Sequence, residues 1–146
     1  GKVSKLSTRE NYDDRTLSLS PAVSIKNTHH AADTSKLKVT LLVFGKSVTD
    51  SRAYYVFLKE SKKMDGLNPD QSREVRYKTI RADYDDRGYA KFGSRYHGYA
   101  VIVQDENGAL IEFKSVPSTY QKHGLALLKL KSGKYFDKYL ESYTVR

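Results

Sequence analysis

Apolar and polar residues alternate with a period of two in several short segments that precede Pro117. The clearest is residues 37–45, where every second residue is apolar and where Leu42 and Phe44 make the opposite face apolar as well. A period of two is typical of a half-buried β-strand, and two apolar faces predict a central strand covered on both sides at one end. The same alternation predicts strands in residues 17–25, 54–59 and 75–80. Pro21 cannot donate to a strand ladder, so we expect an edge strand that switches or kinks there.

A β-hairpin is predicted over residues 99–114, where two alternating segments flank residues 105–108. Asn107 and Gly108 both tolerate positive φ, which a type I′ turn requires. A turn of this type fixes the register and places the following residues opposite each other: Ile102 and Phe113, Val103 and Glu112, Gln104 and Ile111. The apolar residues of both strands then share the core face, namely Ile102, Ile111 and Phe113. With the other strands, the residues expected to be buried are Val39, Leu41, Val43, Val56, Ile102, Ile111 and Phe113.

The pattern changes after Pro117. Residues 118–131 fit a helix that Ser118 could cap, but a period-two pattern in the same residues leaves a strand open. Gly124 disfavours the helix by about 1 kcal/mol. Residues 135–143 place aromatic and aliphatic side chains at helical spacing, which predicts a short helical segment.

Strands that follow one another without intervening helices predict antiparallel pairing. The expected fold class is therefore mainly β, an immunoglobulin-like antiparallel β-sandwich with one or more short C-terminal helical segments. We expect a single domain over residues 15–146, preceded by a flexible tail over residues 1–14, in which charges of both signs leave little to bury. The Cys–Trp–Cys signature of antibody domains is missing, since the chain contains neither residue type.

Composition narrows the setting of this domain. The chain of 146 residues carries a net charge of +9 and no Cys, which excludes disulfides and thiolate metal sites. Its apolar runs, such as residues 41–44, are far shorter than the roughly 18 residues of a transmembrane helix. The sequence begins with Gly1 rather than Met, so we expect that a signal peptide has been removed and that the protein is periplasmic or extracellular.

The motifs that would indicate catalysis or metal binding are missing from the sequence. The four histidines lack a metal-binding spacing, and residues 83–88 match a calcium loop only at their start. Residues 97–104 partly match an RNA-recognition motif, but Val101 and Gln104 stand where stacking rings belong. No nucleophile elbow or phosphate-binding loop occurs. We therefore expect no enzymatic activity, no metal and no cofactor.

Three segments carry a family resemblance: residues 96–108 (YHGYAVIVQDENG), residues 114–118 (KSVPS) and residues 133–137 (GKYFD). They resemble exported immunoglobulin-like β-sandwich proteins of mucin-dwelling bacteria that are associated with type IV pilus-like surface machinery. The resemblance implies a non-enzymatic interaction or adhesion module at a bacterial cell envelope, with protein partners. It supplies no functional residue, and the sequence has no N-terminal pilin helix.

Residues 83–99 are the candidate binding segment, because aromatic and basic side chains alternate there with three glycines. Tyr and Arg often carry interface energy, and loops at the ends of a sandwich often carry recognition. The residues expected to bind are Tyr84, Arg87, Tyr89, Lys91, Phe92, Arg95 and Tyr96. The alternative is that these rings fold back over an open end of the core. Two other functions remain open, a basic domain that binds nucleic acid or acidic glycan, and a carbohydrate-binding module.

Overall fold

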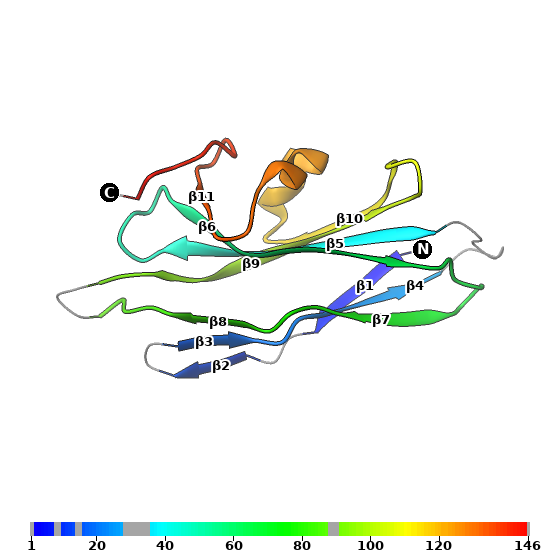
Figure 1. The fold of residues 1–146 in the computed structure, drawn as a ribbon, viewed down its shortest axis with the longest axis horizontal. Helices are drawn as coiled ribbons and strands as arrows, with labels where there is room; N and C mark the ends of the chain where they lie inside the picture. Colours follow the sequence, from blue (N-terminus) through cyan, green and yellow to red (C-terminus); the bar gives the residue numbers. More distant parts are fainter. Residues whose placement is uncertain (1, 8–9, 14–15, 28–35, 88–90, 146) are drawn as a thin grey trace.

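The computed structural model describes residues 2–7, 10–13, 16–27, 36–87 and 91–145, and within them the protein is mainly β (Figure 1). The strands of the first half are β1 (Lys2–Ser7), β2 (Glu10–Asp13), β3 (Thr16–Leu19), β4 (Ala22–Lys26), β5 (Leu37–Ser47) and β6 (Tyr54–Met64). The elements of the second half are β7 (Ser72–Arg76), β8 (Ile80–Asp83), β9 (Ser94–Gln104), β10 (Leu110–Val116), the 3₁₀ helix η1 (Ser118–Lys129) and β11 (Tyr135–Phe136). No helix among these described residues is long and apolar enough to cross a membrane.

The strands form two antiparallel layers. One layer is a five-stranded sheet in the order β10-β9-β5-β6-β11, and the other contains the sheets β1-β4-β7 and β2-β3-β8. The second layer amounts to three long strands, each interrupted near its middle. The two parts of each long strand follow one another in the chain: β1 and β2, β3 and β4, and β7 and β8. In immunoglobulin lettering, β10, β9, β5 and β6 take the places of strands G, F, C and C′. The three interrupted strands take the places of A (β1 and β2), B (β3 and β4) and E (β7 and β8). These strand neighbours are those of immunoglobulin-like sandwiches. The predicted fold class is confirmed.

The interruption in the second layer lies at Pro21. Tyr77 donates its backbone N–H to the Pro21 carbonyl at 3.0 Å, and the hydroxyls of Ser20 and Thr79 lie 3.4 Å apart, so contact continues across the gap. The predicted switch between two strands is confirmed. The predicted edge position is wrong, because β3 and β4 are both central strands. Pro21 stands between two paired stretches, where its missing N–H breaks no ladder bond.

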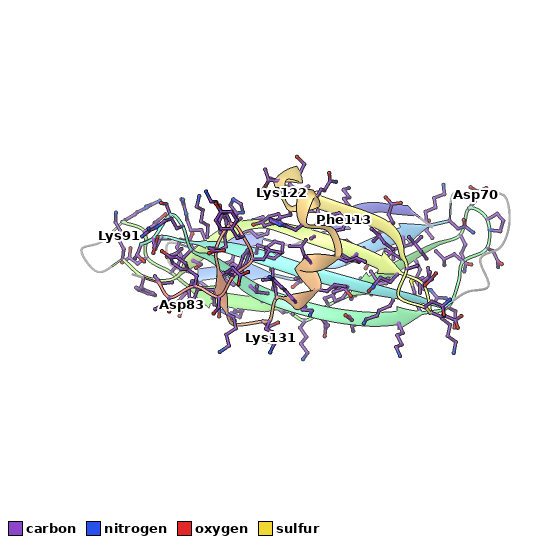
Figure 2. All side chains as sticks on the ribbon, turned by 90° about the horizontal axis from the view of Figure 1, so that it is seen from above. Asp70, Asp83, Lys91, Phe113, Lys122 and Lys131 are labelled. Carbon is purple, nitrogen blue, oxygen red and sulfur yellow. The ribbon has the colours of Figure 1, made fainter. Side chains whose placement is uncertain are left out.

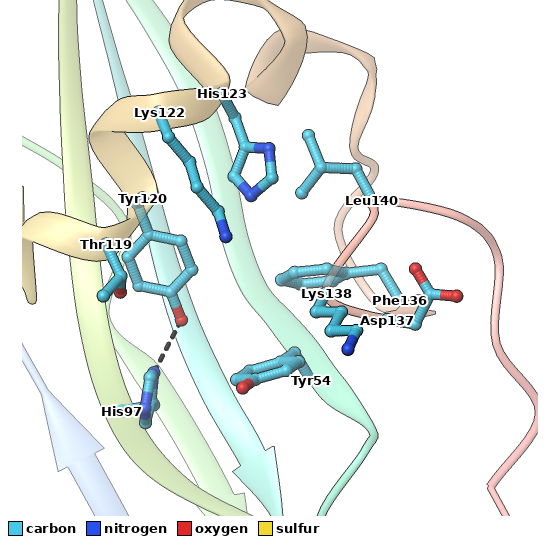
Figure 3. Close-up of a pocket in the computed structure, with 10 residues that line it drawn as sticks. All are labelled: Tyr54, His97, Thr119, Tyr120, Lys122, His123, Phe136, Asp137, Lys138 and Leu140. Carbon is cyan, nitrogen blue, oxygen red and sulfur yellow. Dashed lines mark hydrogen bonds between the residues drawn. The ribbon is translucent and has the colours of Figure 1, made fainter.

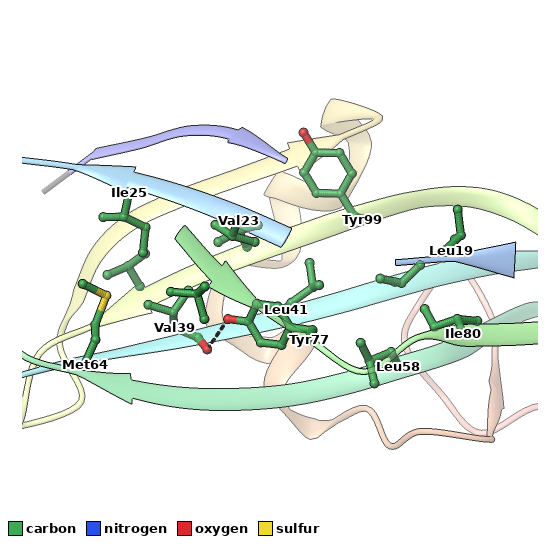
Figure 4. Close-up of a cluster of buried hydrophobic side chains, with 14 of the residues drawn as sticks. Leu19, Val23, Ile25, Val39, Leu41, Leu58, Met64, Tyr77, Ile80 and Tyr99 are labelled. Carbon is green, nitrogen blue, oxygen red and sulfur yellow. Dashed lines mark hydrogen bonds between the residues drawn. The ribbon is translucent and has the colours of Figure 1, made fainter. Parts of the chain in front are cut away.

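Apolar side chains form two cores, one on each face of the five-stranded sheet. The core between the layers includes Val39 and Leu41 of β5, and the Tyr77 hydroxyl donates to the Val39 carbonyl at 2.8 Å (Figure 4). On the opposite face, Leu42 and Phe44 of β5 pack under η1 and the C-terminal segment. Strand β5 is therefore buried on both faces, as its two apolar faces predict. Of the seven residues predicted to be buried, five are: Val39, Leu41, Val43, Val56 and Ile102.

The hairpin between β9 and β10 differs from the prediction at its turn. Asn107 lacks the positive φ of a type I′ turn, and Gly108 alone adopts it, at +83°. The Gly108 N–H donates to the Asp105 carbonyl, and the Asp105 carboxylate accepts N–H groups from Asn107 and Ala109. This arrangement closes a three-residue loop.

The register of this hairpin shifts by a bulge at Ile111. Phe113 faces Ile102 and Glu112 faces Val103 as predicted, but Gln104 faces Leu110 rather than Ile111. The bulge turns the Ile111 side chain toward the core between the layers, whereas Phe113 packs under η1. Both side chains are only partly buried, so their predicted full burial and shared face are wrong.

The C-terminal segment is helical only in η1. Pro117 precedes this helix, no side chain caps it, and Gly124 interrupts it with φ of 54° and ψ of −133°, so the predicted cap at Ser118 is wrong. The predicted helix over residues 135–143 is also wrong. Strand β11 pairs there with β6, and the Asp137 carboxylate accepts the N–H groups of Tyr139 and Glu141 at 2.8 and 3.0 Å. A carboxylate that captures nearby N–H groups favours a turn over a helix.

The described residues within 1–14, namely 2–7 and 10–13, also differ from the expected flexible tail. Within them, β1 pairs with β4 and β2 pairs with β3. The N-terminal segment thus supplies the outer strands of the second layer.

Candidate functional site: a basic aromatic pocket beside helix η1

The seven residues predicted to bind a partner do not converge. Tyr84 is 8% exposed and belongs to the core between the layers, and Tyr96 packs partly buried against the same core. Phe92 is 49% exposed. Tyr89 lies outside the described residues. The remaining predicted residues have exposed side chains, namely Arg87, Lys91 and Arg95.

The described residues between β8 and β9 pair with each other through one isolated bridge. Asp85 and Phe92 exchange two backbone hydrogen bonds of 2.9 and 3.0 Å, and Arg95 lies 3.4 Å from the Asp86 carboxylate. Figure 2 shows Lys91 at one end of the elongated sandwich, far from Lys122 of η1. The rings of Tyr84 and Tyr96 thus close the end of the core, and a binding role for the exposed residues stays a prediction.

A pocket of about 210 Å³ lies elsewhere, on the outer face of the five-stranded sheet (Figure 3). Strand β6 contributes its first residue, Tyr54, and β9 contributes His97, which lies at a register shift against β5. Helix η1 and the segment after β11 form the walls. The lining residues are Tyr54, His97, Thr119, Tyr120, Lys122, His123, Phe136, Asp137, Lys138 and Leu140.

Packed aromatic rings make the floor of this pocket rigid. Phe44 stacks on Tyr120 at 4.3 Å between ring centroids, and Phe136 stacks on Tyr54 at 5.5 Å. Tyr120 and Phe136 are 5% and 3% exposed, so both belong to the core. Tyr54 remains partly exposed and lies edge-to-face with His97 at 5.4 Å. The Lys46 ammonium also lies over the Tyr54 ring, 5.5 Å from its centroid, so a ligand can reach only the part of the ring that Phe136 and Lys46 leave exposed.

A short hydrogen bond joins the floor to η1. The Nδ1 atom of His97 lies 2.6 Å from the Tyr120 hydroxyl (Figure 3). Burial raises the pKa of the Tyr120 phenol, while burial and the nearby Lys46 ammonium lower the pKa of His97. A protonated phenol and a neutral imidazole therefore share this bond at neutral pH.

The rim of the pocket is positively charged. Lys122 and Lys138 are exposed, and no acidic side chain in the described part of the chain pairs with either. Burial lowers the pKa of His123, and the nearby ammonium groups of Lys122 and Lys129 lower it further. The Asp137 carboxylate already accepts two backbone N–H groups through its Oδ1 atom. The pocket can thus receive an anionic group next to an aromatic ring.

Sequence reasoning missed this pocket because its residues come from four separate segments. It treats His97 and His123 as isolated, although both line the same hollow. The one local signal was the helix that residues 118–131 can form, because its helical spacing places Tyr120 on the same face as Leu127. Within the described residues, no group of three or more His, Asp or Glu side chains could hold a metal ion.

Comparisons with known proteins give structural likenesses at low identity. The sequence matches no family model and no curated protein sequence. A β-glucuronidase of Bacteroides uniformis is 11% identical, with a TM-score of 0.48 over 75% of this chain and 12% of the enzyme. A calcium-binding mutant of β-glucuronidase 2 from the same organism is 10% identical, with a TM-score of 0.44 over 90% of this chain and 12% of the enzyme.

A third likeness is to β-glucosidase 3B of Thermotoga neapolitana in complex with glucose. It is 18% identical, with a TM-score of 0.34 over 78% of this chain and 15% of the enzyme. The chain thus spans only a small part of the length of each of these enzymes.

Proposed function

We propose that this protein is a non-catalytic binding module whose pocket beside η1 holds an acidic sugar. The observation that supports this proposal is the partly exposed Tyr54 ring within a rim of Lys122, Lys138 and His123. The part of the Tyr54 ring that Phe136 and Lys46 leave exposed can contact the apolar C–H groups of a sugar, and a uronic acid adds a carboxylate that an ammonium group attracts. Tyr also suits a polar ligand because its hydroxyl remains available for hydrogen bonding.

The size of the pocket supports a single sugar ring. Pockets for drug-sized ligands measure roughly 300–1,000 Å³. The pocket here measures about 210 Å³, and three of its lining residues are exposed: Thr119, Lys122 and Lys138. One ring therefore fits, with the rest of a larger molecule in solvent. The envelope location and the pilus association that the sequence resemblance implies remain predictions.

Two probes that differ only at C6, galacturonic acid and galactose, test this proposal. We expect galacturonic acid to shift the backbone amide signals of Tyr54, His97 and His123 in two-dimensional NMR spectra. Galactose should bind more weakly because it lacks the carboxylate. A single lysine–carboxylate contact near the surface contributes about 0.2–1 kcal/mol, which corresponds to at most about fivefold in affinity.

Two variants assign the binding to the pocket. Lys122→Gln should reduce galacturonic acid affinity about two- to fivefold, and Tyr54→Leu should weaken both sugars. Lys26→Gln removes one charge from an exposed position on the opposite layer and is the matched control. Equal binding of the two sugars, or equal effects of the two lysine variants, would contradict the proposal.

A further inference from the structure

A second hollow of about 400 Å³ lies beside the first. The two hollows share Phe136 and Leu140, so they lie on either side of the segment that follows β11. The second hollow begins at the end of η1 and is bordered by Lys129, Lys131 and Lys134.

These lysines carry largely uncompensated charge. Lys131 and Lys134 are exposed, and neither has an acidic partner within ion-pair distance among the described residues. Lys129 lies 3.7 Å from Glu141, but the side chains are 51% and 71% exposed, and exposed pairs of this kind are weak. Glu141 also lines the second hollow, so three lysines and one carboxylate leave it with an excess of positive charge.

The partly buried Lys59 indicates the same local excess of positive charge near this hollow. The Lys59 ammonium donates to the Leu128 carbonyl at the end of η1. Burial lowers the pKa of Lys59, and the nearby ammonium groups of Lys38 and Lys131 lower it further. An anion in the second hollow would relieve this repulsion.

The segment between the two hollows is held in place at several points. Phe136 and Leu140 are 3% and 5% exposed. The Asp137 N–H donates to the Glu141 carbonyl at 3.0 Å, and the Tyr143 hydroxyl donates to the Asp50 carboxylate at 2.6 Å. The two hollows therefore keep a fixed separation, which suits a ligand with charges at regular intervals.

We propose that the two hollows are neighbouring subsites for one chain of an acidic polysaccharide. This inference rests on the proposed function, because the first subsite is the pocket that holds a single acidic sugar. Single-stranded nucleic acid is the less favoured occupant. Proteins that bind it stack successive bases on exposed rings. In the described part of the chain, Tyr139 is the one strongly exposed aromatic ring in the segment that separates the two hollows.

Galacturonic acid and its oligomers of two to six units provide the test, with Kd measured by calorimetry or NMR on the full chain. A ligand that reaches both subsites gains through effective concentration, and such gains span about 10²–10⁴-fold for well-matched linkers. We expect a rise in affinity of at least tenfold at the length that first spans both hollows. Further units should add little.

The double variant Lys131→Gln/Lys134→Gln isolates the second subsite. It should lower affinity for the spanning oligomer about tenfold and leave galacturonic acid binding within twofold of the wild type. Lys26→Gln/Lys78→Gln removes two exposed charges from the opposite layer and is the matched control. Both double variants should melt at the wild-type temperature, since all four side chains are exposed.

The possible outcomes separate the two proposals. If galacturonic acid binds but affinity does not rise with length, the second subsite is wrong and the first proposal stands. The same holds if the two double variants behave alike. If neither the monomer nor the oligomers bind, both proposals fail. If an oligothymidylate of equal charge binds as tightly and loses as much affinity in Lys131→Gln/Lys134→Gln, the surface binds polyanions generally, and the polysaccharide inference is overturned.

Discussion

The hydrogen bond between His97 and Tyr120 allows a direct test of how η1 is held against the five-stranded sheet. It links β9 to η1 across the outer core, and the atoms are 2.6 Å apart. Tyr120→Phe removes the hydroxyl and keeps the ring, which stacks on Phe44 at 4.3 Å. The substitution therefore separates the hydrogen bond from the packing.

The expected loss follows from the burial of the two partners. A typical hydrogen bond contributes about 0.5–1.5 kcal/mol, and a buried partner left unsatisfied costs about 1–3 kcal/mol. The His97 side chain is only partly buried, so water can replace the lost hydroxyl to some extent. We expect Tyr120→Phe to lower the free energy of unfolding by about 1–2 kcal/mol. For a chain near 150 residues this lowers Tm by roughly 2–8 °C.

Urea and thermal unfolding at pH 7.5 measure this loss, and Tyr139→Phe is the control. Tyr139 is 68% exposed, so removing its hydroxyl should change stability by less than about 0.5 kcal/mol. Tyr120→Ala removes the ring too and should cost about 3–5 kcal/mol. If Tyr120→Phe unfolds at the same urea concentration as Tyr139→Phe, the bond to His97 contributes nothing and our account of how η1 is anchored is wrong.

Two further predictions concern pH and close packing. The pKa values of His97 and His123 are lowered in the folded state, mainly by burial, so the unfolded chain binds protons more readily. The free energy of unfolding should therefore be at its full value above about pH 6.5 and should fall as the pH decreases below it. Urea unfolding between pH 7.5 and 5 measures this change. An unchanged pH dependence in His97→Gln/His123→Gln would exclude these groups as the cause. At Gly98, a Cβ atom would lie 2.0 Å from the Val116 carbonyl oxygen. Gly98→Ala should therefore lower Tm markedly, which calorimetry measures. A wild-type Tm would show that β9 and β10 are farther apart than described.

Local patterns in the sequence predict the strands well, because each strand records its burial in its own residues. Leu42 and Phe44 show that β5 has two covered faces, and the structure supplies a core for each. The hairpin shows where such reasoning stops. Its apolar pattern identifies both strands and the pairing of Ile102 with Phe113, but it does not reveal the bulge at Ile111 or the Asp105 carboxylate that accepts two N–H groups in the turn. Hydrophobic periodicity does not record that interaction.

The candidate site could not be predicted because it depends on the topology rather than on one segment. The binding segment proposed from sequence was rich in rings and cations, yet two of its rings, Tyr84 and Tyr96, pack in or against the core between the layers. The pocket beside η1 becomes visible only when β6 and β9 are placed on either side of β5. Helical spacing after Gly133 was misleading for a related reason, since the Asp137 carboxylate determines a turn there.

The position of the pocket follows from the way the outer face of the five-stranded sheet is covered. The inner face packs against a complete layer of strands, whose regular side-chain alternation fills the space between them. The outer face is covered by one interrupted 3₁₀ helix and an irregular segment, as Figure 2 shows for η1 crossing the sheet. Such a cover buries Leu42 and Phe44 but is too narrow to enclose the whole face. Hollows remain along its margins, and lysines line them because the margins are open to water. The same incomplete cover that makes this face of the sandwich irregular therefore leaves the basic hollows in which we propose that a ligand binds.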